Sequence, residues 1–202
     1  GARFGPAAFF DLLNAGKESV MLDLRTPVGR NSLRHLLESA DIVVESARPR
    51  ALEQMGIRAA DLVAAGTGRT WIAITGHGRC TPQRDWIAYG DDAGVAAGLS
   101  ELLRRASGQP VFCADAVADP LTGLHAAVLA WHAWCSGSGG LFDVSLYTVT
   151  AHCAALHVSP STATDSGVPV AAPVARPVSQ RAAAPGADTV RVLCEFAHGR
   201  MA

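Results

Sequence analysis

Asp119 is the carboxylate in this sequence best placed to do chemistry, because it stands with Pro120 at the start of a long apolar segment. An aspartate followed by proline is typical of a helix start, so one interpretation is the N-cap of a helix over 119–135. The same position also favours catalysis. Free backbone amides and the positive helix end would keep a carboxylate ionised and oriented, ready to attack an activated acyl group. From the residue types alone both roles stay open.

A second candidate is the turn Gly76-His77-Gly78, which directly follows a predicted strand. The full glycine pattern of a dinucleotide-binding turn is absent, because Thr81 stands where the third glycine would be. The turn is therefore interpreted either as a tight bend that needs glycine or as backbone amides that line a ligand cleft. Arg48 follows another predicted strand, where an arginine either contacts a phosphate or lies in a solvated turn.

His125, His132 and Cys135 recur at helical spacing, so they are predicted to share one helix face. A zinc site would want ligands at i and i+4 with carboxylates nearby, so we predict a buried face with small polar residues and no metal site. The five cysteines are odd in number and contain no CxxC pair, which favours reduced thiols in a cytoplasmic protein.

Strands and helices alternate over most of the chain, which predicts an α/β fold with a mainly parallel sheet and flanking helices. The predicted strands are 19–24, 41–45, 71–75 and 141–145. The predicted helices start at Thr26-Pro27 and cover 51–55, 59–65, 119–135 and 146–157. Ligands of such sheets bind beyond the carboxyl ends of the strands, so the loops after these strands are the places to look for a site.

The composition changes after Val158, where prolines recur without any helix or strand period. We therefore predict an α/β domain over 1–158 and a Pro/Ala-rich C-terminal tail over 159–202, with a last short strand or helix at 190–196. The net charge is −1 and the apolar stretch 121–135 is too short to cross a bilayer, which argues against nucleic-acid and membrane partners.

Five segments stand in an order that occurs in a known family. They read LNAGKES with LDLRTPVGR (13–30), DIVVESARP (41–49), ITGHG followed by TP (74–82), ADPLTGLH (118–125) and FDVSL (142–146). Together they resemble the family III CoA-transferases, the CaiB/BaiF group, which includes formyl-CoA and carnitine-CoA transferases and the α-methylacyl-CoA racemases. The resemblance implies the Rossmann-like large domain of that family's fold.

The resemblance also implies a mechanism with Asp119 as the nucleophile. The aspartate would form a mixed anhydride with the donor acyl group and then an aspartyl-CoA thioester, from which the acceptor acid takes CoA. By the same resemblance, CoA would lie along Lys17, Ser46, Ala47, Arg48, Thr75, Gly76, His77 and Gly78. Acyl-CoA and a carboxylic acid are then the substrates, and no tightly bound cofactor is expected.

The chain departs from the family at positions that bear on activity. Tyr89 stands where the racemases carry a histidine, which favours a transferase over a racemase. Ser46 and Ala47 replace the usual asparagine and phenylalanine before Arg48, a change that would weaken CoA contacts. Gly90 replaces an aspartate, although Asp91 is next to it.

The family's first strand and helix, and its smaller second domain, are expected to have no counterpart in these 202 residues. Two readings therefore stay open: an active CoA-transferase, or a shortened, inactive relative that binds CoA or a partner chain. A homodimer or a partner chain would supply the missing elements. A nicotinamide oxidoreductase has little support, since its glycine pattern is incomplete.

Overall fold

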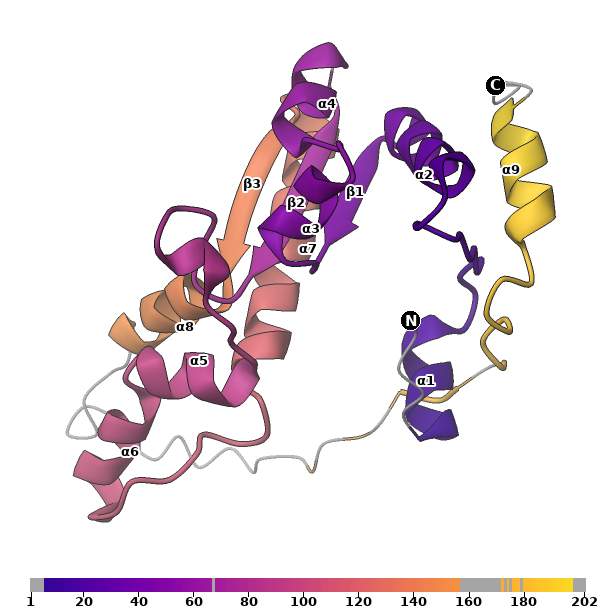
Figure 1. The fold of residues 1–202 in the computed structure, drawn as a ribbon. Coiled ribbons are helices and arrows are strands. Elements are labelled where there is room, and N and C mark those ends of the chain that lie inside the picture. Colours follow the sequence, from indigo (N-terminus) through magenta and orange to yellow (C-terminus); the bar gives the residue numbers. More distant parts are fainter. Residues whose placement is uncertain are drawn as a thin grey trace. The chain divides into compact units, whose positions relative to one another are not determined.

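The computed structural model describes residues 6–66, 68–156, 172, 174, 176–178 and 180–197. By its internal contacts the chain divides into two compact units, Gly1–Ser39 with Thr164–Ala202, and Ala40–Ala163. The domain boundary predicted at residue 158 lies outside the described residues and stays a prediction. The elements in chain order are α1 (Ala7–Asn14), α2 (Pro27–Ser39), β1 (Ile42–Glu45), α3 (Pro49–Gln54), α4 (Ala59–Ala65), β2 (Thr70–Thr75), the 3-10 turn η1 (Gln83–Asp85), α5 (Gly90–Ala96), α6 (Leu99–Ser107), α7 (Ala118–Ser136), β3 (Gly140–Ser145), α8 (Leu146–Ala155) and α9 (Thr189–Ala197) (Figure 1).

The second unit is an α/β structure around a parallel sheet with the strand order β1-β2-β3. Glu45 pairs with Ala73, and Thr75 pairs with Ser145, so the strands end at one edge of the sheet. Three of the four predicted strands and the predicted fold class are thereby confirmed. A parallel sheet requires a crossover between neighbouring strands, and the helices between the strands provide it.

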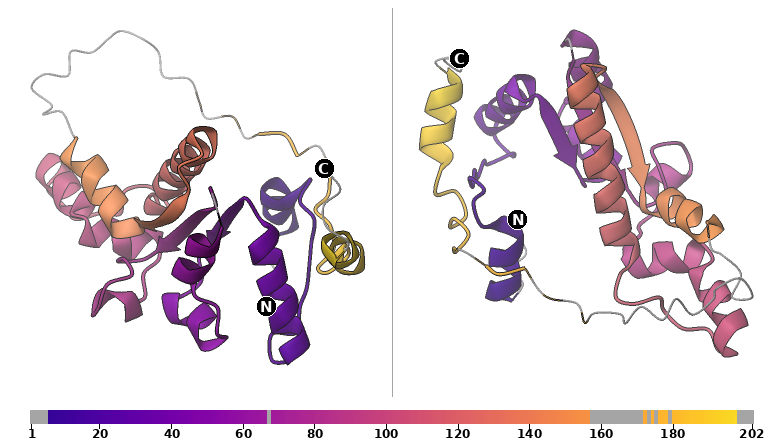
Figure 2. Two further views of the ribbon diagram at one scale, coloured as in Figure 1. Left: turned by 90° about the horizontal axis from the view of Figure 1, so that it is seen from above. Right: turned by 180° about the vertical axis from the view of Figure 1, so that it is seen from behind.

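Helices cover both faces of this sheet. Ile72 and Val144 pack with Ala126 and Ala130 of α7 in one core cluster. Trp71, the neighbour of Ile72 on β2, points to the opposite face because side chains alternate along a strand. That face carries α3 and α4 (Figure 2).

No helix in the described part of the chain is long and apolar enough to cross a membrane.

The face of α7 that meets the sheet is not the predicted one. His125, His132 and Cys135, predicted to be buried together, are all exposed. The buried positions of this helix are Ala118, Thr122, Ala126, Ala130 and Ala133. Their small side chains let the helix backbone approach the sheet closely, whereas the larger residues of the other face remain outside.

No group of three His, Cys, Asp or Glu side chains in the described ranges is placed to hold a metal ion.

The strand predicted at 19–24 is wrong, because residues 19–23 have no regular secondary structure and Leu24 begins a turn. The backbone of this segment instead meets the residues at the start of α9. Ser19 N donates to Asp188 Oδ2 at 2.8 Å, and Met21 N donates to Thr189 Oγ1 at 3.0 Å. These side chains accept the hydrogen bonds that a neighbouring strand would accept. The last element, left open between strand and helix, is the helix α9.

Helix α2 begins as the sequence predicts. Thr26 Oγ1 accepts a hydrogen bond from Gly29 N at 3.0 Å, and Pro27 is the first helical residue. This is the arrangement of an N-cap threonine with proline at the first position.

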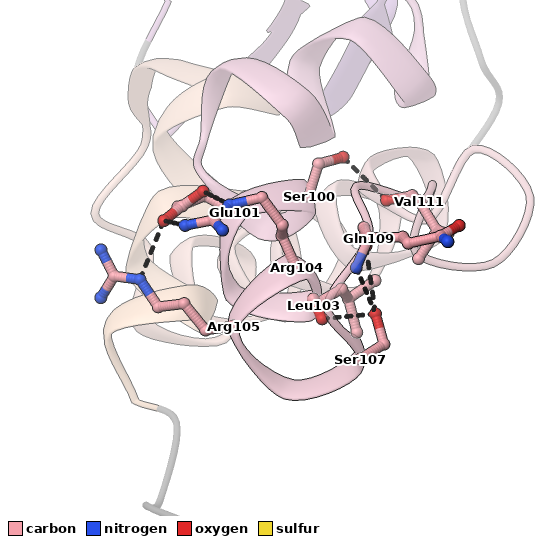
Figure 3. Close-up of polar contacts among 8 residues, drawn as sticks. All are labelled: Ser100, Glu101, Leu103, Arg104, Arg105, Ser107, Gln109 and Val111. Carbon is pink, nitrogen blue, oxygen red and sulfur yellow. Dashed lines mark hydrogen bonds and ion pairs between the residues drawn. The ribbon is translucent and has the colours of Figure 1, made fainter.

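Helices α1, α5 and α6 are not predicted by the sequence. The last of them has no buried residue and carries ion pairs on its surface: Glu101 accepts hydrogen bonds from Arg104 Nε at 2.6 Å and from Arg105 Nε at 2.9 Å (Figure 3). These arginines lower the pKa of Glu101 to about 2. Ser100 Oγ donates to Val111 O at 2.9 Å, which ties the chain after α6 back to the helix (Figure 3).

Candidate active site at the carboxyl edge of the sheet

The turn after β2 requires glycine at two positions. A Cβ on residue 76 would stand 2.8 Å from Ala88 Cβ, closer than two carbon atoms pack. Gly78 has φ +99°, a left-handed conformation that side chains disfavour. Gly76 O accepts a hydrogen bond from Tyr147 N at 3.0 Å, so the first residues of α8 hold this turn against the end of β3.

Asp143 of β3 fixes the same turn from the neighbouring strand. Thr75 Oγ1 donates to Asp143 Oδ1 at 2.8 Å, and Arg79 N donates to Asp143 Oδ2 at 2.7 Å. Gly78 N donates in turn to Thr75 Oγ1 at 3.0 Å. Two backbone amides of the turn are thus bonded within the protein, which supports its interpretation as a strand-end bend. The sequence signal for Asp143 was available, because aspartate is depleted from strands.

His77 is held at this edge by two aromatic rings. Its ring meets Trp86 edge-on, with centroids 5.4 Å apart, and meets Tyr147 at 5.8 Å in a tilted arrangement. Both contacts are of the kind that aromatic side chains favour. The imidazole is half-buried, and its direction is set by side chains from the loop after β2 and from α8.

Ion pairs join the loop after β1 to the loop after β2. Arg84 Nη2 lies 2.6 Å from Glu53 Oε2, and Arg50 Nη1 lies 3.4 Å from Asp85 Oδ1. Such exposed pairs contribute little stability, but they place α3 beside η1. The two loops therefore lie side by side at the carboxyl edge of the sheet.

The residues predicted to contact CoA fall into two groups. Ser46, Ala47 and Arg48 are exposed in the loop after β1, and residues 75–78 form the end and turn of β2. These seven share one edge of the second unit. Lys17 is exposed and belongs to the first unit.

A buried carboxylate closes the end of β1. Glu45 Oε1 accepts a hydrogen bond from Trp71 Nε1 at 2.9 Å and lies 3.3 Å from Arg79 Nη1. The Glu45 and Arg79 side chains are only 10% and 19% exposed. Burial raises the pKa of Glu45, and the bonds from Trp71 and Arg79 offset part of this rise. Glu45 Oε2 is buried without a partner in the described chain.

Because the pKa of Glu45 is higher in the folded than in the unfolded chain, the folded state binds more protons between those two pKa values. The free energy of unfolding therefore falls as the pH rises through this window. Glu45→Gln cannot lose this proton. We therefore expect the free energy of unfolding of the variant, relative to that of the wild type, to be higher at about pH 7 than at about pH 4. Urea denaturation at both pH values measures this, and a difference that does not change with pH would contradict it.

Asp119 lies in the first turn of α7, and its predicted role as the N-cap is wrong. The helix begins one residue earlier, at Ala118, and the preceding Val117 makes no side-chain cap. Asp119 N donates to Ala116 O at 2.9 Å. The side chain is exposed, and its carboxylate accepts no hydrogen bond within the described part of the chain.

The surroundings of Asp119 also correct the expectation that they favour its ionised form. Partial burial raises the pKa of this carboxyl first, and the like charges of Asp91 and Asp92 on α5 raise it further. Asp91 and Asp92 lie on another helix, so no local sequence pattern connects them to Asp119. A carboxylate without hydrogen-bond donors and with a raised pKa is a better nucleophile than a fully solvated one.

A small apolar cluster places the first turn of α7 at the carboxyl edge. Ala118 is fully buried with Ala93 of α5 and Leu146, the first residue of α8 after β3. Ala88 packs against this cluster and is also the residue that closely approaches Gly76. The start of α7 is therefore connected through Ala88 to the turn that carries His77, and both lie where β2 and β3 end.

A groove of about 560 Å³ lies along β3 between α7 and α8. Its lining residues are Leu124, His125, Val128, Leu129, His132, Asp143, Val144, Ser145, Thr148 and Val149. The groove has the volume of a small-molecule site. None of the residues predicted to contact CoA lines it, but Asp143, which fixes the turn after β2, does.

Comparisons with known proteins agree on one family. A family model described as CoA-transferase family III matches residues 2–187. Succinate–glutarate CoA-transferase of Agrobacterium fabrum is 32% identical over 149 residues, which are 71% of this chain and 37% of that protein. Formyl-CoA:oxalate CoA-transferase of Escherichia coli is 30% identical over 119 residues, 59% of this chain and 29% of that protein. The crystal structure of a CaiB/BaiF family protein from Brucella suis superposes with a TM-score of 0.65 and 27% identity, covering 72% of this chain and 39% of that one. The chain thus spans well under half the length of these relatives.

Proposed function

The chain belongs to CoA-transferase family III, and from this we propose that it moves CoA between carboxylic acids with Asp119 as the nucleophile. The observation that carries the proposal is the position of this carboxylate. It stands exposed and without a hydrogen bond from the described chain, on a helix start packed against the ends of β2 and β3. Ligands of parallel sheets bind at this edge.

The proposed reaction begins when a carboxylate oxygen of Asp119 attacks the carbonyl carbon of the donor acyl-CoA. The C–S bond breaks, CoA leaves as a thiolate, and a mixed anhydride remains. The thiolate then attacks the carbonyl carbon of Asp119, so that the donor acid leaves as a carboxylate and an aspartyl-CoA thioester forms. The acceptor carboxylate runs the same two steps in reverse and leaves as its CoA thioester.

Every nucleophile and every leaving group in this sequence is an anion, so no step needs a proton donor or acceptor. This agrees with the surroundings of Asp119, where the nearby charged groups are other carboxylates. The oxyanion of each tetrahedral intermediate would be stabilised by backbone amides close to the nucleophile. The reaction requires ionised Asp119, and the raised pKa moves its acid limb to a higher pH than that of an ordinary aspartate.

For CoA we propose contacts with Ser46, Ala47 and Arg48, and with Thr75, Gly76, His77 and Gly78 of the second unit. Lys17 of the first unit stays a CoA contact implied by the family resemblance alone. The exposed guanidinium of Arg48 is the strongest phosphate ligand among those of the second unit. CoA acts here as a substrate, and no tightly bound cofactor is proposed. The resemblance to the family also implies a homodimer or a partner chain that would contribute to the site.

The test of this function is covalent trapping. The purified chain is incubated with an acyl-CoA and hydroxylamine, which converts an aspartyl anhydride or thioester into a stable hydroxamate. Intact-mass spectrometry is expected to show one hydroxamate per chain, dependent on the acyl-CoA. A chain of unchanged mass with several acyl-CoA donors would contradict the proposal.

A second candidate is a CoA-binding or partner-binding subunit without catalysis. The observation that favours it is the surroundings of Asp119, where partial burial and the charges of Asp91 and Asp92 disfavour the ionised nucleophile. Isothermal titration with CoA separates the candidates. Heat of binding without hydroxamate supports the binding subunit. If both the heat of binding and the hydroxamate are absent, only a structural or partner role is left. An acyl-CoA racemase is disfavoured, since Tyr89 stands at the position of the racemase histidine.

A further inference from the structure

The four residues before α7, 114–117, contain two strained positions. Ala114 has φ 58° and Ala116 has φ 48°, both in the left-handed region that residues with a Cβ avoid. Such conformations persist only where the surroundings hold them, and they concentrate at functional sites. Asp119 follows Ala116 by three residues, so the strained backbone leads directly into the turn that carries the candidate nucleophile.

The first turn of α5 holds this backbone. Asp91 Oδ1 accepts a hydrogen bond from Ala116 N at 2.9 Å. Gly90 lets the two segments come this close, because a Cβ on residue 90 would stand 2.6 Å from Ala116 O. That same carbonyl oxygen accepts the hydrogen bond from Asp119 N at 2.9 Å. Ala116 is thus bonded on both sides: its N–H donates to Asp91, and its carbonyl oxygen accepts from the N–H of Asp119.

We propose that Asp91 is a positioning residue for Asp119: its carboxylate fixes Ala116 in the left-handed conformation and thereby fixes the direction of the first turn of α7. The inference rests on the proposed function, in which Asp119 is the nucleophile. Asp91 does not touch the reacting atoms in this scheme. It acts through a hydrogen bond to the backbone.

The tether has an electrostatic consequence, because Asp91 brings a negative charge next to Asp119. Partial burial, Asp91 and Asp92 together raise the pKa of Asp119. The titratable side chains on the other elements packed against α7 are Asp143 of β3 and Tyr147, His152 and Cys153 of α8, while β2 has none. Asp91 therefore has two separable effects on Asp119, one through geometry and one through charge.

Asp92 offers a matched control. It also raises the pKa of Asp119, but its Oδ2 accepts a hydrogen bond from Tyr89 N at 3.1 Å, at the start of its own helix. It makes no bond to Ala116 in the described structure. Asp92→Asn removes a charge and leaves the tether intact. Asp91→Asn removes a charge but keeps an acceptor oxygen, and Asp91→Ala removes both.

The experiment measures the rate of hydroxamate formation with acyl-CoA and hydroxylamine across pH for the wild type and these three variants. We expect Asp91→Ala to slow the reaction at neutral pH by about 10-fold to 100-fold, the effect of a misplaced reacting group. Asp91→Asn and Asp92→Asn are expected to stay within about 3-fold of the wild type, because the tether is kept. All three variants should shift the acid limb to lower pH, because each removes a charge that raises the pKa of Asp119.

Two results would overturn the inference: an Asp91→Ala rate equal to that of Asp92→Asn, or an Asp91→Asn rate as low as that of Asp91→Ala. A wild type that forms no hydroxamate overturns the proposed function as well, so the two failures are distinguishable.

Circular dichroism checks the fold of each variant. If Asp91→Ala does not fold, it is combined with Ala116→Gly, since glycine adopts the left-handed conformation without strain. Recovery of folding and rate in this double variant supports the tether, and a rate still far below that of Ala116→Gly alone contradicts it.

Discussion

Asp119→Asn is expected to abolish hydroxamate formation, with a loss of at least about 10³-fold. The amide nitrogen carries no negative charge and the amide oxygen is a weak nucleophile, so the first bond of the proposed reaction cannot form. The variant keeps the size of the side chain and its place in the first turn of α7. The measurement is intact-mass spectrometry of wild type and variant after the same exposure to acyl-CoA and hydroxylamine.

Asp61→Asn is the control for this loss. Asp61 is also an exposed aspartate in the first turn of a helix, α4, and it is not among the residues of the candidate site. We expect it to form hydroxamate at the wild-type rate. Unfolding is not expected to explain the loss in Asp119→Asn, because the raised pKa of Asp119 means that its ionised form is disfavoured in the folded chain. A hydroxamate in Asp119→Asn at the wild-type level would contradict the assignment.

Trp71→Ala is expected to lower the free energy of unfolding by about 3–5 kcal/mol. Trp71 is 0% exposed at the centre of the sheet, so its removal leaves a large cavity between β2 and the helices on that face. It also removes the Trp71 Nε1 donor from the buried carboxylate of Glu45. Urea denaturation followed by circular dichroism measures the change.

Trp131→Ala is the matched control, because Trp131 is 65% exposed on α7. A substitution of this kind is expected to change the free energy of unfolding by about 0.5 kcal/mol or less. Trp71→Phe should fall between the two, since it retains most of the ring but no donor to Glu45. Equal stability of the Trp71→Ala and Trp131→Ala variants would contradict the described core.

The sequence predicts those parts of the fold that rest on local patterns. The apolar runs at 41–45, 71–75 and 141–145 are strands because each is short, β-branched in part and bounded by turn residues. The run at 19–24 has the same character but no strand beside it. Its hydrogen bonds go to Asp188 and Thr189, which a reading of neighbouring residues cannot connect to it.

The buried face of α7 shows a second limit. The helical spacing of His125, His132 and Cys135 predicts that their face is buried. Alanines form the contact with the sheet instead, because close approach of backbones requires small residues. The same limit applies to the site. Thr75 and Asp143 are 68 residues apart in the chain, and Ala116 and Asp91 are 25 apart. Their bonds appear only when the strands and helices are placed in space.

The order of family motifs nevertheless led to the residues of the carboxyl edge, although it could not supply their surroundings. The helix start singles out Asp119 in the sequence, and the structure adds the strained backbone before it and the carboxylates beside it. These features depend on how α5 packs against α7, and no single segment contains that information.

The most direct test of the account is the position of the trapped group. The chain is incubated with acyl-CoA and hydroxylamine, digested, and its peptides are sequenced by mass spectrometry. The account predicts a hydroxamate on Asp119 and on no other carboxyl group. A hydroxamate on a different side chain, or none on Asp119 while CoA transfer proceeds, would contradict it.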